Sequence, residues 1–134
     1  MKKFIFITSC VAFLALSFSC SSVPKEIPTD KTLEELKLQA YEYSAKGKYD
    51  ASEKYYRTII ERFGTNVEVQ VSCEFEIAHL YVKQKKFNKA EPLLNKVLSY
   101  YEIDPSLPAQ YKKLAALDLQ KVKDHNEKNK PKTK

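Results

Sequence analysis

Glycine is scarce in this chain, which has only Gly47 and Gly64 among its 134 residues. A phosphate-binding loop needs several clustered glycines, because its backbone must come close to the phosphate oxygens. The sequence has no such cluster, so it offers no nucleotide-binding loop. Both glycines instead lie at the ends of predicted helices, and Gly47 suits the left-handed position that commonly ends a helix.

Histidine is as rare as glycine, and neither copy has a catalytic or metal-binding spacing around it. His79 has no second ligand at the spacing of a zinc motif, and His125 lies near the C-terminus. Glu74 and Glu76 are two residues apart, so they point to different sides of a helix. We therefore expect no enzyme activity, no metal site and no cofactor.

Long apolar runs are absent except at the N-terminus. Lys2 and Lys3 precede an uncharged run of 15 residues, 4–18. As a helix this run would be about 22 Å long, which is shorter than the ~30 Å hydrocarbon core of a bilayer. We expect residues 1–19 to be a cleaved signal peptide rather than a retained membrane span.

Cysteine occurs at only three positions, and each has a different expected role. Cys10 would leave with the signal peptide. Cys20 follows the apolar run directly and resembles the acylated cysteine of bacterial lipoproteins, although Ser17 stands where the usual motif has leucine. Ordinary cleavage to a free secreted chain is the alternative. Cys73 would then remain alone, which excludes an internal disulfide, and its apolar neighbours predict a buried structural thiol.

The net positive charge of +6 comes from the two ends of the chain. Residues 121–134 carry six lysines against two acidic residues, whereas residues 20–120 have no net charge. A neutral body argues against nucleic acid as a partner. We predict that residues 123–134 form a disordered lysine-rich tail, which either keeps the chain soluble or contacts anionic head groups.

Residues 20–31 are polar and contain Pro24 and Pro28, so we expect a locally extended, lipidated tether. The segment 32–122 then shows the apolar spacing of five helices. Three predicted helices start at a residue that can cap and has an acidic residue three positions later: Thr32, Asp50 and Asn88. The other two are expected from Asn66 to Gln84 and from near Pro108.

The third of these helices is ambiguous. Between Val67 and Ile77 apolar and polar residues alternate, which is typical of a strand. However, a single strand would have no partner in an otherwise helical chain. We therefore predict a helix here, and an all-α fold overall.

The chain also repeats itself at an offset of 38 residues. Ala40 and Tyr43 correspond to Ala78 and Tyr81, and the match continues through aromatic and aliphatic positions of the next helix. A period of this length is typical of solenoids, in which each unit buries its apolar face against its neighbours. A further shift of 38 places Ala116 on Ala78, which predicts a third first helix without a second.

This pattern resembles the tetratricopeptide repeat, with the small residue at Ala40 or Ala78 and the aromatic residue at Tyr49 or Phe87. The repeat is longer than the usual ~34 residues. Together with Cys20 and the short tether, it resembles lipoproteins of the BamD type. The resemblance implies an antiparallel helix-hairpin solenoid of about two and a half repeats.

In tetratricopeptide proteins particular first-helix positions line an inner groove, and the resemblance carries these positions over to this chain. The candidate partner-binding residues are Lys37, Tyr41, Ser44, Phe75, His79, Val82, Lys83, Lys113, Leu117 and Gln120. The lysines, Tyr41 and His79 would suit a peptide with acidic groups or a free carboxylate.

The resemblance implies a scaffold that binds proteins, is anchored by lipid in the outer membrane and faces the periplasm. We expect an accessory of outer-membrane β-barrel assembly. The alternative is a tetratricopeptide lipoprotein of a periplasmic transport complex or of a cell-envelope or division complex.

Overall fold

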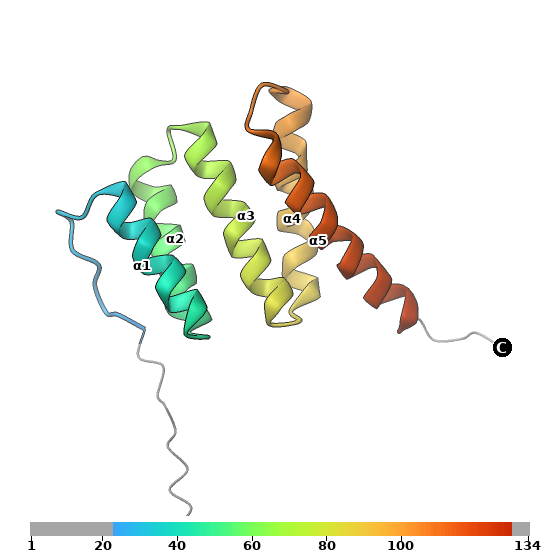
Figure 1. Cartoon of the computed structure of the whole chain (residues 1–134), viewed down its shortest axis with the longest axis horizontal. Coiled ribbons are helices and arrows are strands. Elements are labelled where there is room, and N and C mark those ends of the chain that lie inside the picture. Colours follow the sequence, from blue (N-terminus) through green and yellow to red (C-terminus); the bar gives the residue numbers. More distant parts are fainter. Residues whose placement is uncertain (1–22, 130–134) are drawn as a thin grey trace, which may run out of the picture.

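The computed structural model describes residues 23–129, which fold into five α-helices with no strand in that range (Figure 1). Helices α1 and α2 form one antiparallel hairpin, α3 and α4 form a second, and α5 packs against α4 and α3. The fold is therefore the all-α helix-hairpin solenoid that the sequence predicts. The helix bounds are α1 Leu33–Ala45, α2 Tyr49–Phe63, α3 Val67–Lys83, α4 Phe87–Ile103 and α5 Ala109–Lys128.

Two helices start where a polar side chain caps them, as predicted. The Thr32 hydroxyl accepts a hydrogen bond from the Glu35 amide at 3.2 Å, and the Glu35 carboxylate accepts one from the Thr32 amide at 2.8 Å. Asn66 caps α3 by accepting from the amides of Glu68 and Val69. These bonds satisfy amide groups that a helix start otherwise leaves without partners.

The predicted starts of α2 at Asp50 and of α4 at Asn88 are wrong, because each helix begins one residue earlier and has no side-chain cap. Both follow the same backbone turn, in which the amide of Lys48 or Lys86 donates to the carbonyl of a tyrosine five residues back, at 2.8 Å. Gly47 takes a left-handed φ of 70° in the first turn, and Lys85 takes 57° in the second. Gly64 ends α2, as predicted, and has a right-handed φ of −70°.

Helix α3 is central, and its position explains the strand-like sequence. It packs against α2, α4 and α5, so several sides of it are buried. Alternate residues from Val69 to Ile77 all lie in the core, and Cys73 among them is 1% exposed. A helix that is buried on several sides loses its polar stripe, so its sequence no longer shows a period of 3.6.

Small residues allow the helices of each hairpin to approach closely. Ala40 in α1 and Ala78 in α3 are fully buried, and the residue that packs there from α2 or α4 is Ser52 or Ala90. Ser52 also donates its hydroxyl to the Ala40 carbonyl at 2.7 Å. The 38-residue correspondence therefore reflects the same packing in both hairpins.

The third copy differs from its predicted register by one residue. Ala115, and not Ala116, is fully buried, together with Val122. A shift of one residue rotates a helix by about 100°, so it changes which α5 side chains face α3. Only this register turns Ala115, Leu119 and Val122 inward and leaves Ala116 exposed.

The predicted disordered tail at 123–134 is wrong for its first six residues, because α5 continues to Lys128. The side chains there lack apolar groups, but they contact the start of α4. The Asn126 amide donates to Glu91 at 3.2 Å, and the His125 ring lies 4.4 Å from the Phe87 ring. The helical domain therefore ends six residues beyond its predicted boundary at 122, and residues 130–134 lie outside the described range.

Residues 23–31, which we call the N-terminal strap, are extended but packed against the domain (Figure 1). Ile27 is buried, and the Arg62 guanidinium donates to the carbonyls of Ile27 and Pro28, each at 2.8 Å. The Lys54 ammonium donates to the carbonyls of Pro24 and Lys25. The predicted tether is therefore held along α2 in its described part. The predicted signal peptide and Cys20 lie outside the described residues.

Among residues 23–129, no helix combines the length and the apolar character that a membrane span requires.

Candidate functional site

The first helices of the successive hairpins, α1, α3 and α5, lie on one face of the molecule (Figure 1). Two adjoining depressions of about 320 and 210 Å³ hollow this face. They share Tyr41, Tyr56 and Glu76, so we treat them as one groove. The groove is lined by Lys37, Tyr41, Ser44, Ala45, Tyr56, Ser72, Cys73, Phe75, Glu76, His79, Lys83, Tyr111 and Leu114.

Six of the sequence-predicted residues meet in this groove: Lys37, Tyr41, Ser44, Phe75, His79 and Lys83. Tyr41 is 67% exposed, whereas Phe75 is only 4% exposed. Phe75 forms part of the floor, because its ring lies 5.7 Å from His79 and 5.8 Å from Tyr111. The groove therefore has an accessible aromatic side chain over a buried aromatic floor.

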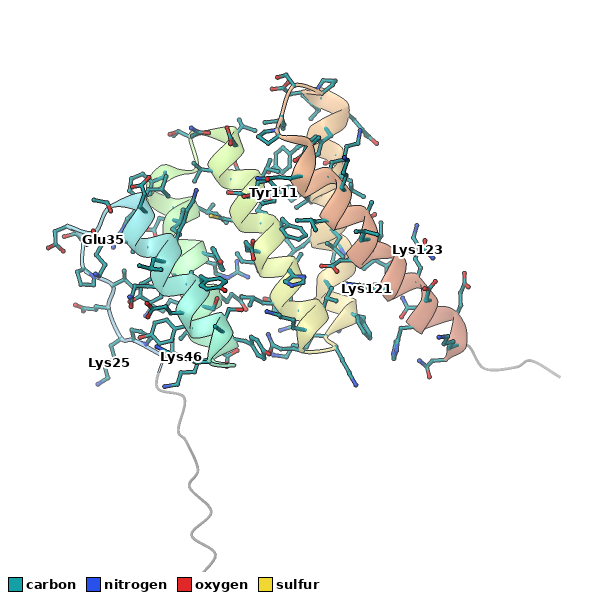
Figure 2. The ribbon with its side chains drawn as sticks, viewed as in Figure 1. Lys25, Glu35, Lys46, Tyr111, Lys121 and Lys123 are labelled. Carbon is teal, nitrogen blue, oxygen red and sulfur yellow. The ribbon has the colours of Figure 1, made fainter. Side chains whose placement is uncertain are left out.

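The predicted residues of α5 do not line the groove. In place of Lys113, Leu117 and Gln120, the structure brings Tyr111 and Leu114 there. Tyr111 lies between α3 and α5 (Figure 2). Aligning on Ala115 instead of Ala116 would predict Lys112, Ala116 and Leu119, which do not line the groove either, so the first-helix positions do not carry over to α5. The spacing Ala115, Leu119 and Val122 gives the correct inner stripe, because i, i+4 and i+7 share one helix face.

The buried carboxylate of Asp118 fixes His79 in the groove. Its Nδ1 lies 2.6 Å from Asp118 Oδ2, and the Lys121 ammonium lies 2.8 Å from Asp118 Oδ1. Although burial disfavours the charged carboxylate, the hydrogen bonds from His79 and Lys121 keep the pKa of Asp118 below its usual value. The ionised Asp118 therefore keeps the proton on His79 Nδ1 and orients the ring. The sequence analysis missed Asp118.

Glu76 contributes a carboxylate at the centre of the groove, and the sequence analysis missed this role as well. It borders both depressions beside Tyr41 and Tyr56. Burial raises its pKa, and the nearby charges of His79 and Lys83 only partly offset this. Glu74, two residues earlier, faces α4 instead, where the Lys96 ammonium lies 2.7 Å away. The two carboxylates thus point to different sides, as expected.

Cys73 borders the groove as a buried, protonated thiol. Burial raises its pKa to about 11, so almost no thiolate is present at neutral pH. The prediction of a buried structural thiol is confirmed. Residues 23–129 contain no group of three or more histidine, cysteine, aspartate or glutamate side chains placed to hold a metal ion.

Comparison with known proteins gives two matches to the tetratricopeptide repeat, at residues 38–66 and 75–104. An uncharacterized protein of Treponema pallidum (strain Nichols) is 38% identical over 112 residues, which cover 81% of this chain. The chain spans about 45% of the length of that relative. No solved structure matches. The two hairpins α1–α2 and α3–α4 therefore each match the tetratricopeptide repeat, and α5 follows them as a further first helix.

Proposed function

We propose that this protein is a membrane-anchored scaffold that binds a protein partner in the groove between α1, α3 and α5. Tetratricopeptide stacks typically use such extended concave surfaces for binding. The observation that carries the proposal is Tyr41, which stays 67% exposed above a floor of buried aromatic residues. Exposed aromatic side chains beside a preformed pocket are common binding hot spots.

Membrane anchoring is supported by the sequence at the N-terminus. The proposed signal peptide 1–19 ends at Cys20, whose thiol would be acylated. Only residues 21 and 22 separate Cys20 from the strap, and an extended chain spans at most ~3.6 Å per residue. A strap held on α2 would therefore keep the helical domain close to the membrane surface.

The partner we propose is a component of outer-membrane β-barrel assembly, with the protein attached to the outer membrane and facing the periplasm. The support is the order of features shared with BamD-type lipoproteins: a candidate lipid-bearing cysteine, a short proline-containing segment and helical repeats. The stack is short, and Leu114 and Leu117 of α5 remain 44% and 61% exposed. A partner that also covers α5 would bury these side chains.

In-cell crosslinking tests the groove directly. A photo-crosslinking residue at Tyr41 should capture a barrel-assembly protein, while the same residue at Asn95, an exposed position of α4, should not. Capture from Asn95 alone would place the contact on the other side of the stack. Repeated failure to capture any protein at Tyr41, with the chain intact, would refute the proposed function.

Substitution of the proposed lipid-bearing residue tests the anchor. Cys20→Ala should move the chain from the membrane fraction to the soluble fraction, because an alanine cannot be acylated. Mass analysis of the mature N-terminus supplies the independent readout. If the variant stays in the membrane fraction, the lipid anchor at Cys20 is wrong.

A transport complex is the second candidate, and one observation favours it. The larger depression, at about 320 Å³, is within the range of small-molecule pockets. A thermal-shift screen with metabolites distinguishes the two, since stabilisation by one small molecule would favour transport. No stabilisation, together with protein capture at Tyr41, would favour the scaffold.

A further inference from the structure

The centre of the groove combines several aromatic rings with one carboxylate. Tyr41, Tyr56 and Tyr111 border the depressions around Glu76, and Phe75 completes the floor. The negative faces of aromatic rings attract cations, with tyrosine among the stronger partners. Neutral phenols also keep this property at physiological pH, since burial raises the pKa of Tyr56 and of Tyr111.

The Glu76 carboxylate has no hydrogen-bond or ion-pair partner among the described residues, whereas the other buried acids of this region do have one. Glu74 is paired with Lys96, and Asp118 is paired with His79 and Lys121. Glu76 is only partly accessible, and burial raises its pKa. A partly buried charge without a partner is unfavourable, and a cation from another molecule would relieve that cost.

Positive side chains of the protein itself lie around the groove but do not satisfy Glu76. His79 directs Nδ1 at Asp118, and the exposed Lys83 ammonium lies 3.4 Å from the Ser44 hydroxyl. Lys37 borders only the smaller depression. Lys83 is exposed, so water solvates it and weakens its field, and the half-buried Lys37 forms no ion pair with Glu76. The one charge fixed in the floor is negative.

We propose that the floor of the groove binds the side chain of a lysine or arginine in an extended segment of the partner. The cationic head would pair with Glu76, while its methylene stem packs between Tyr41 and Tyr56. This inference rests on the proposed function, because it names the chemistry of the partner in the same groove. It differs from the expectation of an acidic peptide, because that expectation was based on the lysines and did not include Glu76.

The test is an NMR titration of the full chain with capped heptapeptides that differ only at the central residue. The central residues are lysine, arginine, norleucine and glutamate, flanked by alanine, serine and glycine. The lysine and arginine peptides should shift the ring signals of Tyr41 and Tyr56. We expect them to bind about tenfold more tightly than the norleucine peptide, as for a charge-assisted hydrogen bond with a partly buried carboxylate.

Two variants distinguish a cationic ligand from an acidic one. Glu76→Gln keeps the size of the side chain and removes its charge, so it should abolish the preference for lysine over norleucine. Lys83→Met should strengthen binding of the lysine peptide about twofold, because it removes a repelling rim charge. If the acidic peptide were the true ligand, Lys83→Met would weaken binding and Glu76→Gln would strengthen it.

Each result decides the question. Preference for the glutamate peptide, no shift with the lysine peptide, or a lysine preference that survives Glu76→Gln would overturn the inference. In these cases the scaffold proposal stands if Tyr41 still captures a protein in cells. If Tyr41 also captures no protein in cells, both the inference and the proposed function are wrong.

Discussion

At the residue scale, Ser52 marks the closest packing between α1 and α2. Its hydroxyl is fully buried and bonds the Ala40 carbonyl, while the equivalent Ala90 in the second hairpin packs without a hydroxyl. We expect Ser52→Ala to lower the free energy of unfolding by about 1 kcal/mol, the usual value of one hydrogen bond. Urea denaturation measures this change, and an unchanged or higher midpoint would contradict it.

The ionised Glu76 should lower the stability of the free protein, because burial raises the pKa of its carboxyl. The folded chain then holds the proton more tightly than the unfolded chain. Stability therefore falls as the pH rises from the pKa of the unfolded chain through the raised pKa of the folded chain. The cost is fully present once the pH lies above the raised pKa of Glu76. Glu76→Gln should therefore raise the Tm by about 2–5 °C. The gain should vanish at about pH 3, where the carboxyl is protonated in both states.

The same ionisation should control binding of a cationic peptide. Affinity should fall as the pH is lowered toward the raised pKa of Glu76, because protonation removes the negative charge. A scanning calorimetry series and a peptide titration over the same pH range would measure both effects. The charged and titratable groups that surround Glu76 are Lys37, Tyr41, Tyr56, Cys73, His79, Lys83, Tyr111 and Asp118.

Single residues of the groove were predictable only where the repeat alignment was unambiguous. The α1 and α3 positions followed from Ala40 and Ala78, each of which has no neighbouring alanine. In α5 the adjacent Ala115 and Ala116 allow two alignments, and neither gives the groove residues Tyr111 and Leu114. Glu76 and Asp118 gave no signal, because surface and groove carboxylates look alike in a sequence.

At the scale of the element, the N-terminal strap is held mainly by two side chains of α2. Arg62 makes two of the contacts, through the carbonyls of Ile27 and Pro28. Arg62→Ala should speed trypsin cleavage after Lys25 about tenfold, as expected when a charged hydrogen bond no longer restrains local opening. Arg57→Ala is the matched control, because Arg57 bonds Glu53 and Tyr81 and not the strap. Equal cleavage in both variants would contradict this role.

Only some of the helix boundaries could be predicted from the local sequence. Thr32 and Asn66 cap their helices as predicted. Asp50 and Asn88 do not, because the tight hairpin turn before them already pairs its backbone groups. The last turns of α5 were missed for a related reason. Their contacts with Phe87 and Glu91 come from another helix and leave no local pattern.

At the scale of the whole molecule, each hairpin is stabilised by its neighbours in the stack. Helix α5 covers α4 and part of α3, and it buries Ala115, Leu119 and Val122. A chain that ends at residue 108 would expose the apolar surface that these residues cover. We expect it to lose several kcal/mol of stability, since stacked repeats share nearest-neighbour interfaces. Its Tm should fall by more than 10 °C, or it should aggregate.

A matched truncation separates loss of α5 from loss of length. A chain that ends at Asn129 retains every described helix, so its Tm should equal that of the full chain. If the chain that ends at residue 108 unfolds at the same temperature, the first four helices are self-sufficient and α5 serves only to line the groove.

The turns before α2 and α4 share a backbone conformation, but a different type of residue occupies the left-handed position in each. Gly47 adopts its left-handed φ at little cost, whereas Lys85 adopts nearly the same angle with a side chain attached. A non-glycine residue in this region costs about 1–2 kcal/mol. The second hairpin therefore carries a strain that the first does not. In engineering terms, position 85 is where a glycine would improve the protein without touching either the core or the groove.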